Sequence, residues 1–387
     1  MQDYKTEQPF DITMSEDQQM TWDMLRKFAE TEMRPNARDT EAFGRPKKAL
    51  MDKMQALELI SLVIPEAYDG MGLEQDAVSQ ALALEALAYG DLSLAMSLSV
   101  PLLTAKIISE HGSEEQKQTF LRPYCSQSLF HVALGMNNAS AMGNPLNSSV
   151  LVEEGQEELI LNGTKTGISY AADASSFLIA ATNASGETNL YFVDHDSEGL
   201  EITAKEYMGL KGLPLSDIAF LNCKIKTSQK LGGHNYSMNF QQLLDSSRIG
   251  MSALALGVCQ AILDYVVPYT NERVAFDEPI SNRQSVAFLV ADMAIEIEAL
   301  RLMVHKAAAL KDLGADFHKQ ASLTYRFAAH HGMKIGTDGV QLLGGHGFTH
   351  EHPVELWYRN LRAIGIFEGG AGAVSYTHLT LPTNREV

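Results

Sequence analysis

The spacing of apolar residues changes twice along this chain of 387 residues, and that pattern limits the folds available to it. Up to Pro123 the apolar residues recur at helical spacing, and strand signals are nearly absent. Between about residues 128 and 232 short alternating runs take their place, and helical spacing returns from Ser237. With 45% apolar residues the chain can build the cores that such a division needs. We therefore expect an α+β protein in three parts.

Residues 1–127 are expected to form an N-terminal all-helical domain, because this run contains several helix start signals. Ser15 to Gln18 and Ser113 to Gln116 have the spacing of capping boxes, in which side chains and backbone exchange hydrogen bonds at a helix start. The first of these helices should end near Met33, before Pro35. Further helices are expected over Pro46 to Leu59, Glu74 to Tyr89 and Leu92 to His111.

Residues 128–232 are expected to form a small β domain of the barrel or sandwich type. The Asn162-Gly163 pair predicts a hairpin turn. The run from Asp217 to Ile225 alternates between apolar and other residues, but the phase of the alternation slips, which predicts a β-bulge near Phe220. Further strands are expected over Phe177 to Thr182 and Asn189 to Val193.

Residues 233–372 are expected to form a C-terminal four-helix bundle. Apolar residues recur at every fourth position from Leu254 to Val266, which is the pattern of one buried helix face. Pro268 should bend this helix or lie at a turn of weak packing. Residues 373–387 show neither helical spacing nor a cap, so we exclude them from the fold as a non-native tail. Two more long helices are expected over Arg283 to Leu313 and Asp316 to Leu343.

Charge and cysteine content restrict the partners and the compartment of the chain. The formal net charge of −18 disfavours nucleic acid and anionic membrane surfaces as partners. The 3 cysteines are far apart and form no Cys-x-x-Cys pair, so unpaired thiols in a reducing compartment are expected. The start of the chain has no signal or transit pattern, and the uncharged runs are too short to span a bilayer comfortably. We expect a soluble, cytoplasmic protein.

The stretch from Gly344 to Gly370 carries the strongest indication of chemistry. It opens with a glycine-rich turn, where the backbone can approach a ligand closely, and it ends with Glu368 between Phe367 and a pair of glycines. A carboxylate between an aromatic ring and bare backbone is poorly hydrated if it is buried, and desolvation raises its pKa towards the range of a base. The alternative is a surface glutamate at a helix end.

The same stretch resembles the C-terminal signature of the acyl-CoA dehydrogenase family, where a Gly-Gly-x-Gly turn, Pro-Val-Glu, an arginine-rich helix and an aromatic-Glu-Gly triplet recur at this spacing. The resemblance implies FAD-dependent α,β-dehydrogenation of a fatty acyl-CoA thioester, as in fatty acid β-oxidation, with Glu368 removing the α-proton and the flavin accepting the hydride. It implies an oxyanion hole made by the backbone N–H of Glu368 and a flavin hydroxyl. Electrons would pass to an electron-transferring flavoprotein.

Three further residues are expected to contact the substrate. Gly369 follows the base directly, where the backbone must crowd the substrate. Asp245 and Arg248 belong to a run where some family members place the base immediately before the arginine. That position is Ser247 here, and a serine cannot act as an unassisted base, so Glu368 is expected to act alone. The alternative for Arg248 is a surface helix charge.

The resemblance assigns cofactor contacts to distant parts of the chain. Arg273, with Phe276 three residues later, resembles Glu-Arg-x-x-Phe-Gly, whose arginine contacts the FAD pyrophosphate across a subunit boundary. Gln341 with Gly344-Gly345 resembles Gln-x-x-Gly-Gly, which reaches the same cofactor from the neighbouring subunit. A shared site of this kind implies a homo-oligomer, a dimer or by family habit a tetramer. The remaining expected cofactor residues are Ile168, Ser169 and Gln284.

The middle domain departs from the family pattern beside the flavin. The run Gly135 to Leu146 stands where relatives have Thr-Glu-Pro-Gly-Ala-Gly-Ser-Asp. Gly167 replaces the tryptophan of Lys-x-Trp-Ile-Thr, and losing that aromatic wall should cost about 1–3 kcal/mol of cofactor binding. Asp277 and Gly370 replace a glycine and a threonine. These departures leave two alternatives: an acyl-CoA-binding homologue without dehydrogenase activity, and a flavin oxidase or monooxygenase on the same scaffold.

Two other groupings of reactive side chains are disfavoured. His346, His350 and His352 are close in sequence, but the glycine-rich turn and a following proline argue against one helix face that presents all of them to a metal. His318 and Ser322 are one helical turn apart, yet no strained turn or oxyanion hole marks a nucleophile there. We expect no metal. The acyl chain length depends on the depth of the pocket, which the sequence does not give.

Overall fold

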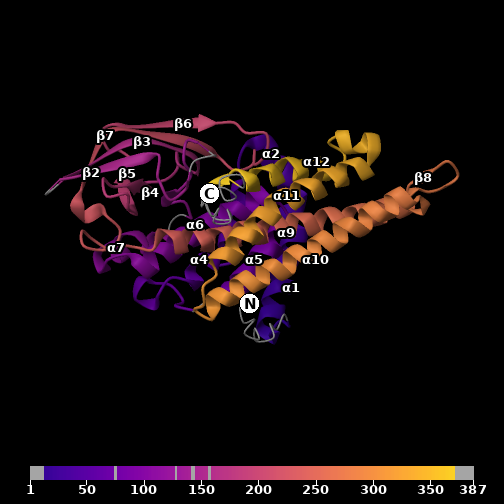
Figure 1. Cartoon of the computed structure of the whole chain (residues 1–387), viewed down its shortest axis with the longest axis horizontal. Helices are drawn as coiled ribbons and strands as arrows, with labels where there is room; N and C mark the ends of the chain where they lie inside the picture. Colours follow the sequence, from indigo (N-terminus) through magenta and orange to yellow (C-terminus); the bar gives the residue numbers. More distant parts are fainter. Residues whose placement is uncertain (1–12, 74–75, 127–128, 141–143, 156–157, 371–387) are drawn as a thin grey trace, which may run out of the picture.

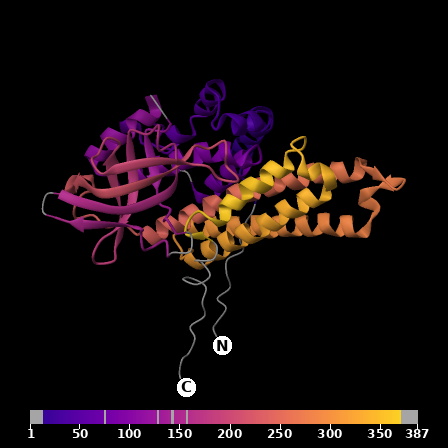
Figure 2. The same ribbon diagram turned by 90° about the horizontal axis from the view of Figure 1, so that it is seen from above.

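The computed structural model describes residues 13–73, 76–126, 129–140, 144–155 and 158–370, and it confirms the expected α+β architecture. Helices come first, a β domain follows, and a helical bundle completes the described chain (Figure 1). The β domain lies at one end of the molecule, and the short hairpin that contains β8 lies at the other end, at the tip of the bundle. Seen from above, the first helices lie beside the bundle and the β domain (Figure 2).

The N-terminal helices begin as the capping signals predict. Ser15 Oγ accepts a hydrogen bond from the Gln18 N–H at 3.2 Å, and Ser113 Oγ accepts one from Gln116 at 3.3 Å, so both capping boxes are confirmed. The helices are α1 (Glu16–Phe28), α2 (Arg34–Phe43), α3 (Lys48–Gln55), α4 (Leu59–Leu62), α5 (Ala77–Ala88), α6 (Leu92–His111), α7 (Glu114–Phe120) and α8 (Arg122–Ser126).

The expected end of the first helix near Met33 is wrong. A π-helical stretch, Ala29–Met33, joins α1 directly to α2, and the chain stays helical as far as Phe43. Pro35 is tolerated because it lies in the first turn of α2, where its missing N–H costs no regular hydrogen bond. A proline therefore marks a change of helix type here, and not an end.

The β domain is one curled sheet with strand order β1-β4-β2-β3-β7-β6, and β5 pairs with the other edge of β4. β1 and β2 run parallel to β4, while the remaining neighbours are antiparallel. The two strands expected from their apolar runs are present as β4 and β5. The bounds are β1 (Val132–Gly135), β2 (Val150–Glu154), β3 (Glu158–Ser169), β4 (Ser176–Thr182), β5 (Thr188–Asp194), β6 (Leu200–Lys205) and β7 (Leu215–Lys226).

The predicted hairpin turn at Asn162-Gly163 is wrong, because both residues lie inside β3. Gly163 pairs with Val150 of β2, so β2 and β3 are connected several residues earlier. The glycine is needed for a different reason: its φ is +131°, and a Cβ there would lie 2.1 Å from the Ser149 carbonyl oxygen. Close approach of a neighbouring backbone, and not a turn, selects glycine at this position.

The predicted bulge near Phe220 is confirmed. The register between β3 and β7 shifts between Leu161 and Gly163, which pair with Cys223 and Phe220. The bulge adds one residue to β7, so Phe220 and Cys223 lie on the same face of the strand although they are three residues apart. Both are buried in the same core, whereas Leu221 is 63% exposed.

The C-terminal bundle contains the apolar face that its sequence predicts. Leu254, Val258, Ile262 and Val266 are all buried within α9. Pro268 lies inside this helix, which continues to Glu272, so it does not mark a turn. The bundle consists of α9 (Phe240–Glu272), α10 (Gln284–Asp312), α11 (His318–Leu342) and α12 (Val354–Leu361), with a tip hairpin of β8 (Val274–Ala275) and β9 (Glu278–Pro279).

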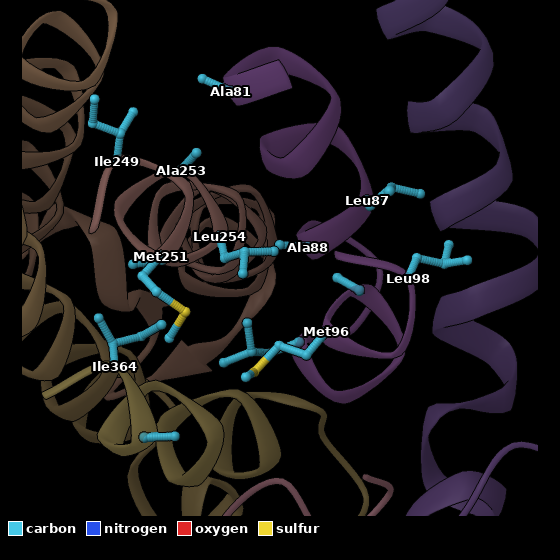
Figure 3. Packing of buried hydrophobic residues seen from close by; sticks show 14 of the residues in the cluster. Ala81, Leu87, Ala88, Met96, Leu98, Ile249, Met251, Ala253, Leu254 and Ile364 are labelled. Atoms are coloured by element: carbon cyan, nitrogen blue, oxygen red, sulfur yellow. The ribbon is translucent and has the colours of Figure 1, made fainter. Parts of the chain in front are cut away.

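The helical parts share one apolar core, in which α9 packs against α5, α6 and α11. Figure 3 shows side chains of α5, α6 and α9 meeting there, with Met96, Met251 and Leu254 among them. Asn360 of α12 ties the parts together, since its Oδ1 accepts the Leu210 N–H at 2.7 Å and its Nδ2 donates to Asp91, the N-cap of α6, at 3.3 Å. The β domain and the bundle are therefore held in a fixed relation.

By length and composition alone, the two helices α6 and α9 could cross a bilayer. The length of the uncharged runs, on which the expectation from sequence was based, did not indicate this. Their most apolar windows are 67% and 72% buried within the described structure, as core helices are. The cysteines Cys125, Cys223 and Cys259 are free thiols, as expected.

Candidate active site

Glu368 lies in the last described turn of the chain, and it is buried, with 8% of its surface exposed. Its backbone has φ +53°, a left-handed conformation that a side-chain-bearing residue adopts only when its surroundings hold it there. The alternative of a surface glutamate at a helix end is therefore wrong.

Three side chains from three separate elements hold this turn. The Glu368 N–H donates to Asn137 Oδ1 at 3.0 Å, in the loop after β1. Arg248 of α9 donates from Nη2 to the Glu368 carbonyl oxygen at 3.3 Å. Tyr325 of α11 donates to the carbonyl oxygens of Ile364, at 2.6 Å, and of Phe367. Both backbone groups of Glu368 are thus fixed before any ligand arrives.

The two carboxylate oxygens of Glu368 have different environments. Ser247 Oγ donates to Oε1 at 2.9 Å, whereas Oε2 is buried and has no hydrogen-bond partner among the residues that the structure describes. Burial raises the pKa of the carboxyl, and the Ser247 hydrogen bond and the charges of Arg248 and Lys165 oppose that rise. A buried oxygen without a partner and with a raised pKa is suited to accepting a proton.

Glu368 lies in the wall of a cavity of about 130 Å³ between the β domain and the helices α5, α6 and α9. Most of the lining is apolar, with Ala81 and Leu84 from α5, Val100 and Leu103 from α6, and Leu254 from α9. Ser169 and Gly167 of β3 also line it. The cavity is therefore an apolar channel with one carboxylate beside it.

Lys165 is a buried cation near Glu368 that the sequence did not single out as a site residue. Its Nζ donates to the Met136 carbonyl oxygen at 3.0 Å and to Asn138 Oδ1 at 2.9 Å, and it is 0% exposed. Burial lowers its pKa to about 7, and the charge of Glu368 opposes that fall. Its position beside Gly167 in the flavin motif was the one available signal.

Asp245 does not line the cavity, and its role is to support Arg248. It is 2% exposed, and it accepts hydrogen bonds from Gln241 and, at 3.3 Å, from Arg248 Nη1. His318 Nδ1 lies 2.7 Å from its other oxygen. Arg248 is 0% exposed, so the surface alternative for this residue is also wrong. Both residues brace the Glu368 turn.

A second cavity, of about 290 Å³, meets the first at Gly167 and Phe367. Its polar lining includes Thr166, Arg359 and Arg362. The Phe367 ring covers Gly167, because a Cβ at that glycine would lie 3.5 Å from it. The aromatic wall lost at position 167 is thus partly replaced from the C-terminal turn.

Gly369 was expected to contact the substrate and Ile168 the flavin, and the two take up different positions. Gly369 lines the second cavity, and a Cβ there would lie 2.5 Å from the Pro145 ring, so the glycine is needed for the loop after β1 as well. Ile168 is 1% exposed in the core of the β domain, and it lines neither cavity. An apolar slot beside arginines and hydroxyls fits a flavin ring system.

The other expected cofactor residues gather at the tip of the bundle. Arg273, Phe276, Gln341, Gly344 and Gly345 all line an open cavity of about 610 Å³ there, and Gln284 at the start of α10 is exposed beside it. This cavity also contains a second guanidinium, from Arg283, and such a donor set fits a pyrophosphate.

The tip is far from Glu368 within one chain. Arg248 and Arg273 are separated by 25 residues of α9, so they lie about 37 Å apart along the helix axis. One bound cofactor cannot contact both groups of residues in the same subunit.

The disfavoured groupings find structural roles. His346 and His352 hydrogen-bond through Nδ1 to Tyr269 and Tyr265, and no cluster suited to a metal occurs among the described residues. Ser322 is fully buried and its Oγ accepts a hydrogen bond from Arg248 at 3.5 Å. Ser322 and His318 thus belong to the support of the Glu368 turn.

Comparison with known proteins gives consistent matches along the chain. Family models described as the N-terminal, middle and C-terminal domains of acyl-CoA dehydrogenase match residues 15–128, 138–223 and 235–375. The human mitochondrial short-chain specific acyl-CoA dehydrogenase is 32% identical over 368 residues, covering 92% of this chain and 88% of its own length.

Two solved structures are similar over almost the whole chain. Butyryl-CoA dehydrogenase from Megasphaera elsdenii has a TM-score of 0.83 at 28% identity, covering 95% of this chain and 98% of the other. A chain in the structure of the electron transferring flavoprotein of Acidaminococcus fermentans has a TM-score of 0.83 at 30% identity, covering 95% and 97%.

Proposed function

Because this chain belongs to the acyl-CoA dehydrogenase family of FAD enzymes, we propose that it dehydrogenates the α,β bond of an acyl-CoA, with Glu368 as the base. The observation that carries the proposal is the Glu368 carboxylate itself. It is buried, its Oε2 is without a hydrogen-bond partner among the described residues, and it lies in the wall of an apolar channel.

Glu368 accepts the α-proton of the thioester at Oε2, while Ser247 holds Oε1 and so fixes the direction of the free oxygen. Burial raises the pKa of this carboxyl, which strengthens it as a base. Arg248 donates to the Glu368 carbonyl oxygen and Tyr325 donates to the Phe367 carbonyl oxygen. These two hydrogen bonds prevent the turn from moving away as the proton is transferred.

The thioester carbonyl needs hydrogen-bond donors, because negative charge develops on its oxygen as the proton leaves. The Glu368 N–H is the expected donor, and in this structure it donates to Asn137 Oδ1. A substrate carbonyl that accepts this N–H must take the place of the Asn137 oxygen. Asn137 also lines both cavities.

FAD, when bound, supplies the acceptor for the β-hydrogen as hydride. Thr166, Gly167 and Phe367 line the second cavity beside the channel, and they would hold the ring against the substrate. Arg273 and Gln341 would hold the pyrophosphate of a cofactor in another subunit, because they lie about 37 Å from Arg248 along α9.

This arrangement supports a homo-oligomer as the working form. The exposed face of α10 carries Phe288, Ile295 and Leu302 at seven-residue spacing, 62%, 67% and 47% exposed. Large apolar side chains repeated along one exposed helix face favour packing against another helix. We propose a tetramer or dimer, a cytoplasmic location, and an electron-transferring flavoprotein as the electron acceptor.

Absorbance spectroscopy tests this function and separates it from the two alternatives. Purified protein should carry an oxidised-flavin spectrum that an acyl-CoA bleaches under anaerobic conditions. Protein that stays colourless after FAD is added would favour an acyl-CoA-binding homologue without activity. Bleaching that reverses in air with stoichiometric peroxide would favour an oxidase.

A further inference from the structure

Two lysines lie in the wall of the channel that Glu368 also lines. Lys106 belongs to α6 and Lys311 to the last turn of α10. Met96, Leu103 and Lys106 line the channel from successive parts of α6, and ten residues of helix span about 15 Å. The cations are therefore separated from Met96 by about the length of a medium acyl chain.

Glu368 and Lys311 have different charged neighbours. The charges that act on Glu368 are those of Arg248 and Lys165, whereas those that act on Lys311 are Lys106, Glu110 and Asp312. Between the ends the lining is apolar, with Ala81, Leu84, Leu103, Ile249 and Leu254.

The two lysines line the channel, whereas the carboxylates near them, Glu110 and Asp312, do not. Lys106 Nζ lies 3.8 Å from Glu110, whose side chain is 53% exposed. The Asp312 carboxylate is used to accept the N–H groups of Ala77 and Val78 at the start of α5, at 2.6 and 3.1 Å.

Burial is the largest influence on Lys311, and it lowers the pKa of its ammonium group, with a further lowering by the charge of Lys106. A methyl end of an acyl chain placed here would leave both ammonium groups partly desolvated without compensation. A carboxylate would remove their mutual repulsion and supply charge-assisted hydrogen bonds.

We propose that the channel selects acyl thioesters whose far end carries a carboxylate, with Lys106 and Lys311 as the specificity-determining residues. This inference rests on the proposed function, because it takes the thioester to lie at Glu368. Ser99 lines the same channel and adds a hydroxyl group for the carboxylate.

Phosphate groups of CoA are the other anions that two lysines can bind. The experiment therefore has one arm for each source. Binding is measured by calorimetry in the Glu368→Gln variant, which should not convert the thioester during the titration. The ligands are pairs of CoA thioesters of equal carbon number, of which one ends in a methyl group and the other in a carboxylate. Free CoA is titrated as the phosphate-only probe.

We expect the carboxylate-ended thioester to bind at least ten times more tightly than its methyl-ended partner at the chain length that reaches the lysines. The double variant Lys106→Met, Lys311→Met should abolish that preference, because it removes both ammonium groups and keeps unbranched side chains. Its affinity for the methyl-ended thioester and for free CoA should be unchanged. Lys224→Met on β7, where the side chain is 63% exposed, is the matched control and should change nothing.

Equal binding of the two thioesters by the unaltered channel would overturn the proposal. So would a loss of affinity in the lysine variants that is the same for both thioesters and for free CoA, since that result assigns the lysines to the phosphates. Retained binding of the methyl-ended thioester shows that the variants are folded. Carboxylate preference without any flavin bleaching would leave this inference standing and contradict the proposed function.

Discussion

The Glu368 turn and the tip of the bundle are the two places where the expected functional residues gather, and they are built in opposite ways. At the turn Glu368, Arg248 and Asp245 are all at most 8% exposed, and each makes hydrogen bonds to residues of other elements. At the tip Phe276 is 88% exposed, and the cavity beside it is open.

This contrast indicates which parts of the chemistry one chain completes by itself. The turn is organised before a ligand binds, because its backbone groups and one carboxylate oxygen already have partners. The guanidinium groups of Arg273 and Arg283 at the tip line an open cavity, where a cofactor or a second subunit can contact them. We therefore propose that the proton-transfer step depends on one chain and cofactor binding on two.

The largest effect is expected from removing the arginine of the buried region. Arg248→Met removes the guanidinium that pairs with the buried Asp245 carboxylate, and it releases the Glu368 carbonyl oxygen, so we expect a loss of about 3–5 kcal/mol in unfolding free energy. Arg273→Met at the exposed tip should change the unfolding free energy of the FAD-free protein by less than about 0.5 kcal/mol. Chemical denaturation of both variants makes the comparison, and equal losses would remove the distinction between the two regions.

The second effect concerns cofactor binding and subunit sharing. Arg273→Met should weaken FAD binding about 10- to 100-fold, because a charge-assisted hydrogen bond to the pyrophosphate is lost. Co-expression of Arg273→Met chains with Glu368→Gln chains should restore activity, since a hybrid oligomer then contains sites with both Glu368 and Arg273.

Hybrids of Arg273→Met chains with chains that carry both substitutions are the control, because they contain Glu368 but no Arg273, and they should show only the low activity of the Arg273→Met protein. Activity that is no higher in the first hybrid than in the control would mean that each site uses the tip of its own chain.

The third effect is a change in pH dependence at the turn. The carboxylate form of Glu368 is the working base, so the rate should rise as the pH increases through its raised pKa. Ser247→Ala removes a donor that stabilises the charged form, which raises that pKa further and moves the profile to higher pH. Ser246→Ala, whose hydroxyl donates to the Gln242 carbonyl oxygen, is the control. A uniform loss of rate at every pH would assign Ser247 a packing role only.

The smallest effect is expected at the Glu368 N–H. Asn137→Ala removes the side-chain oxygen that a thioester carbonyl has to displace, so acyl-CoA binding should tighten by about fivefold, the equivalent of one ordinary hydrogen bond. Calorimetry in the Glu368→Gln background measures it. Weaker binding in this variant would show that Asn137 holds the substrate and does not compete with it.

Local patterns predicted the features that depend on neighbours in sequence. The capping boxes, the buried face of α9 and the bulge after Phe220 follow from side-chain spacing, and all were confirmed. The flanking aromatic residue and glycines left Glu368 either buried or at the surface, and the structure shows it buried.

Features that depend on distant contacts were missed or misread. Lys165, Asn137 and Tyr325 meet Glu368 only because three elements converge, and no spacing within one element reports that convergence. Gly163 was assigned to a turn because nothing in its local sequence reveals the Ser149 carbonyl oxygen that approaches it. Asp245 was assigned to the substrate because its sequence position does not show that it faces Arg248 and His318.

The proton-transfer role of Glu368 can be tested in a single turnover. Glu368→Gln keeps the size of the side chain and removes its basicity, so flavin reduction by an acyl-CoA in an anaerobic stopped-flow experiment should slow by about 10²- to 10⁴-fold while the thioester still binds. Flavin reduction at an unchanged rate would contradict the assignment of Glu368 as the base.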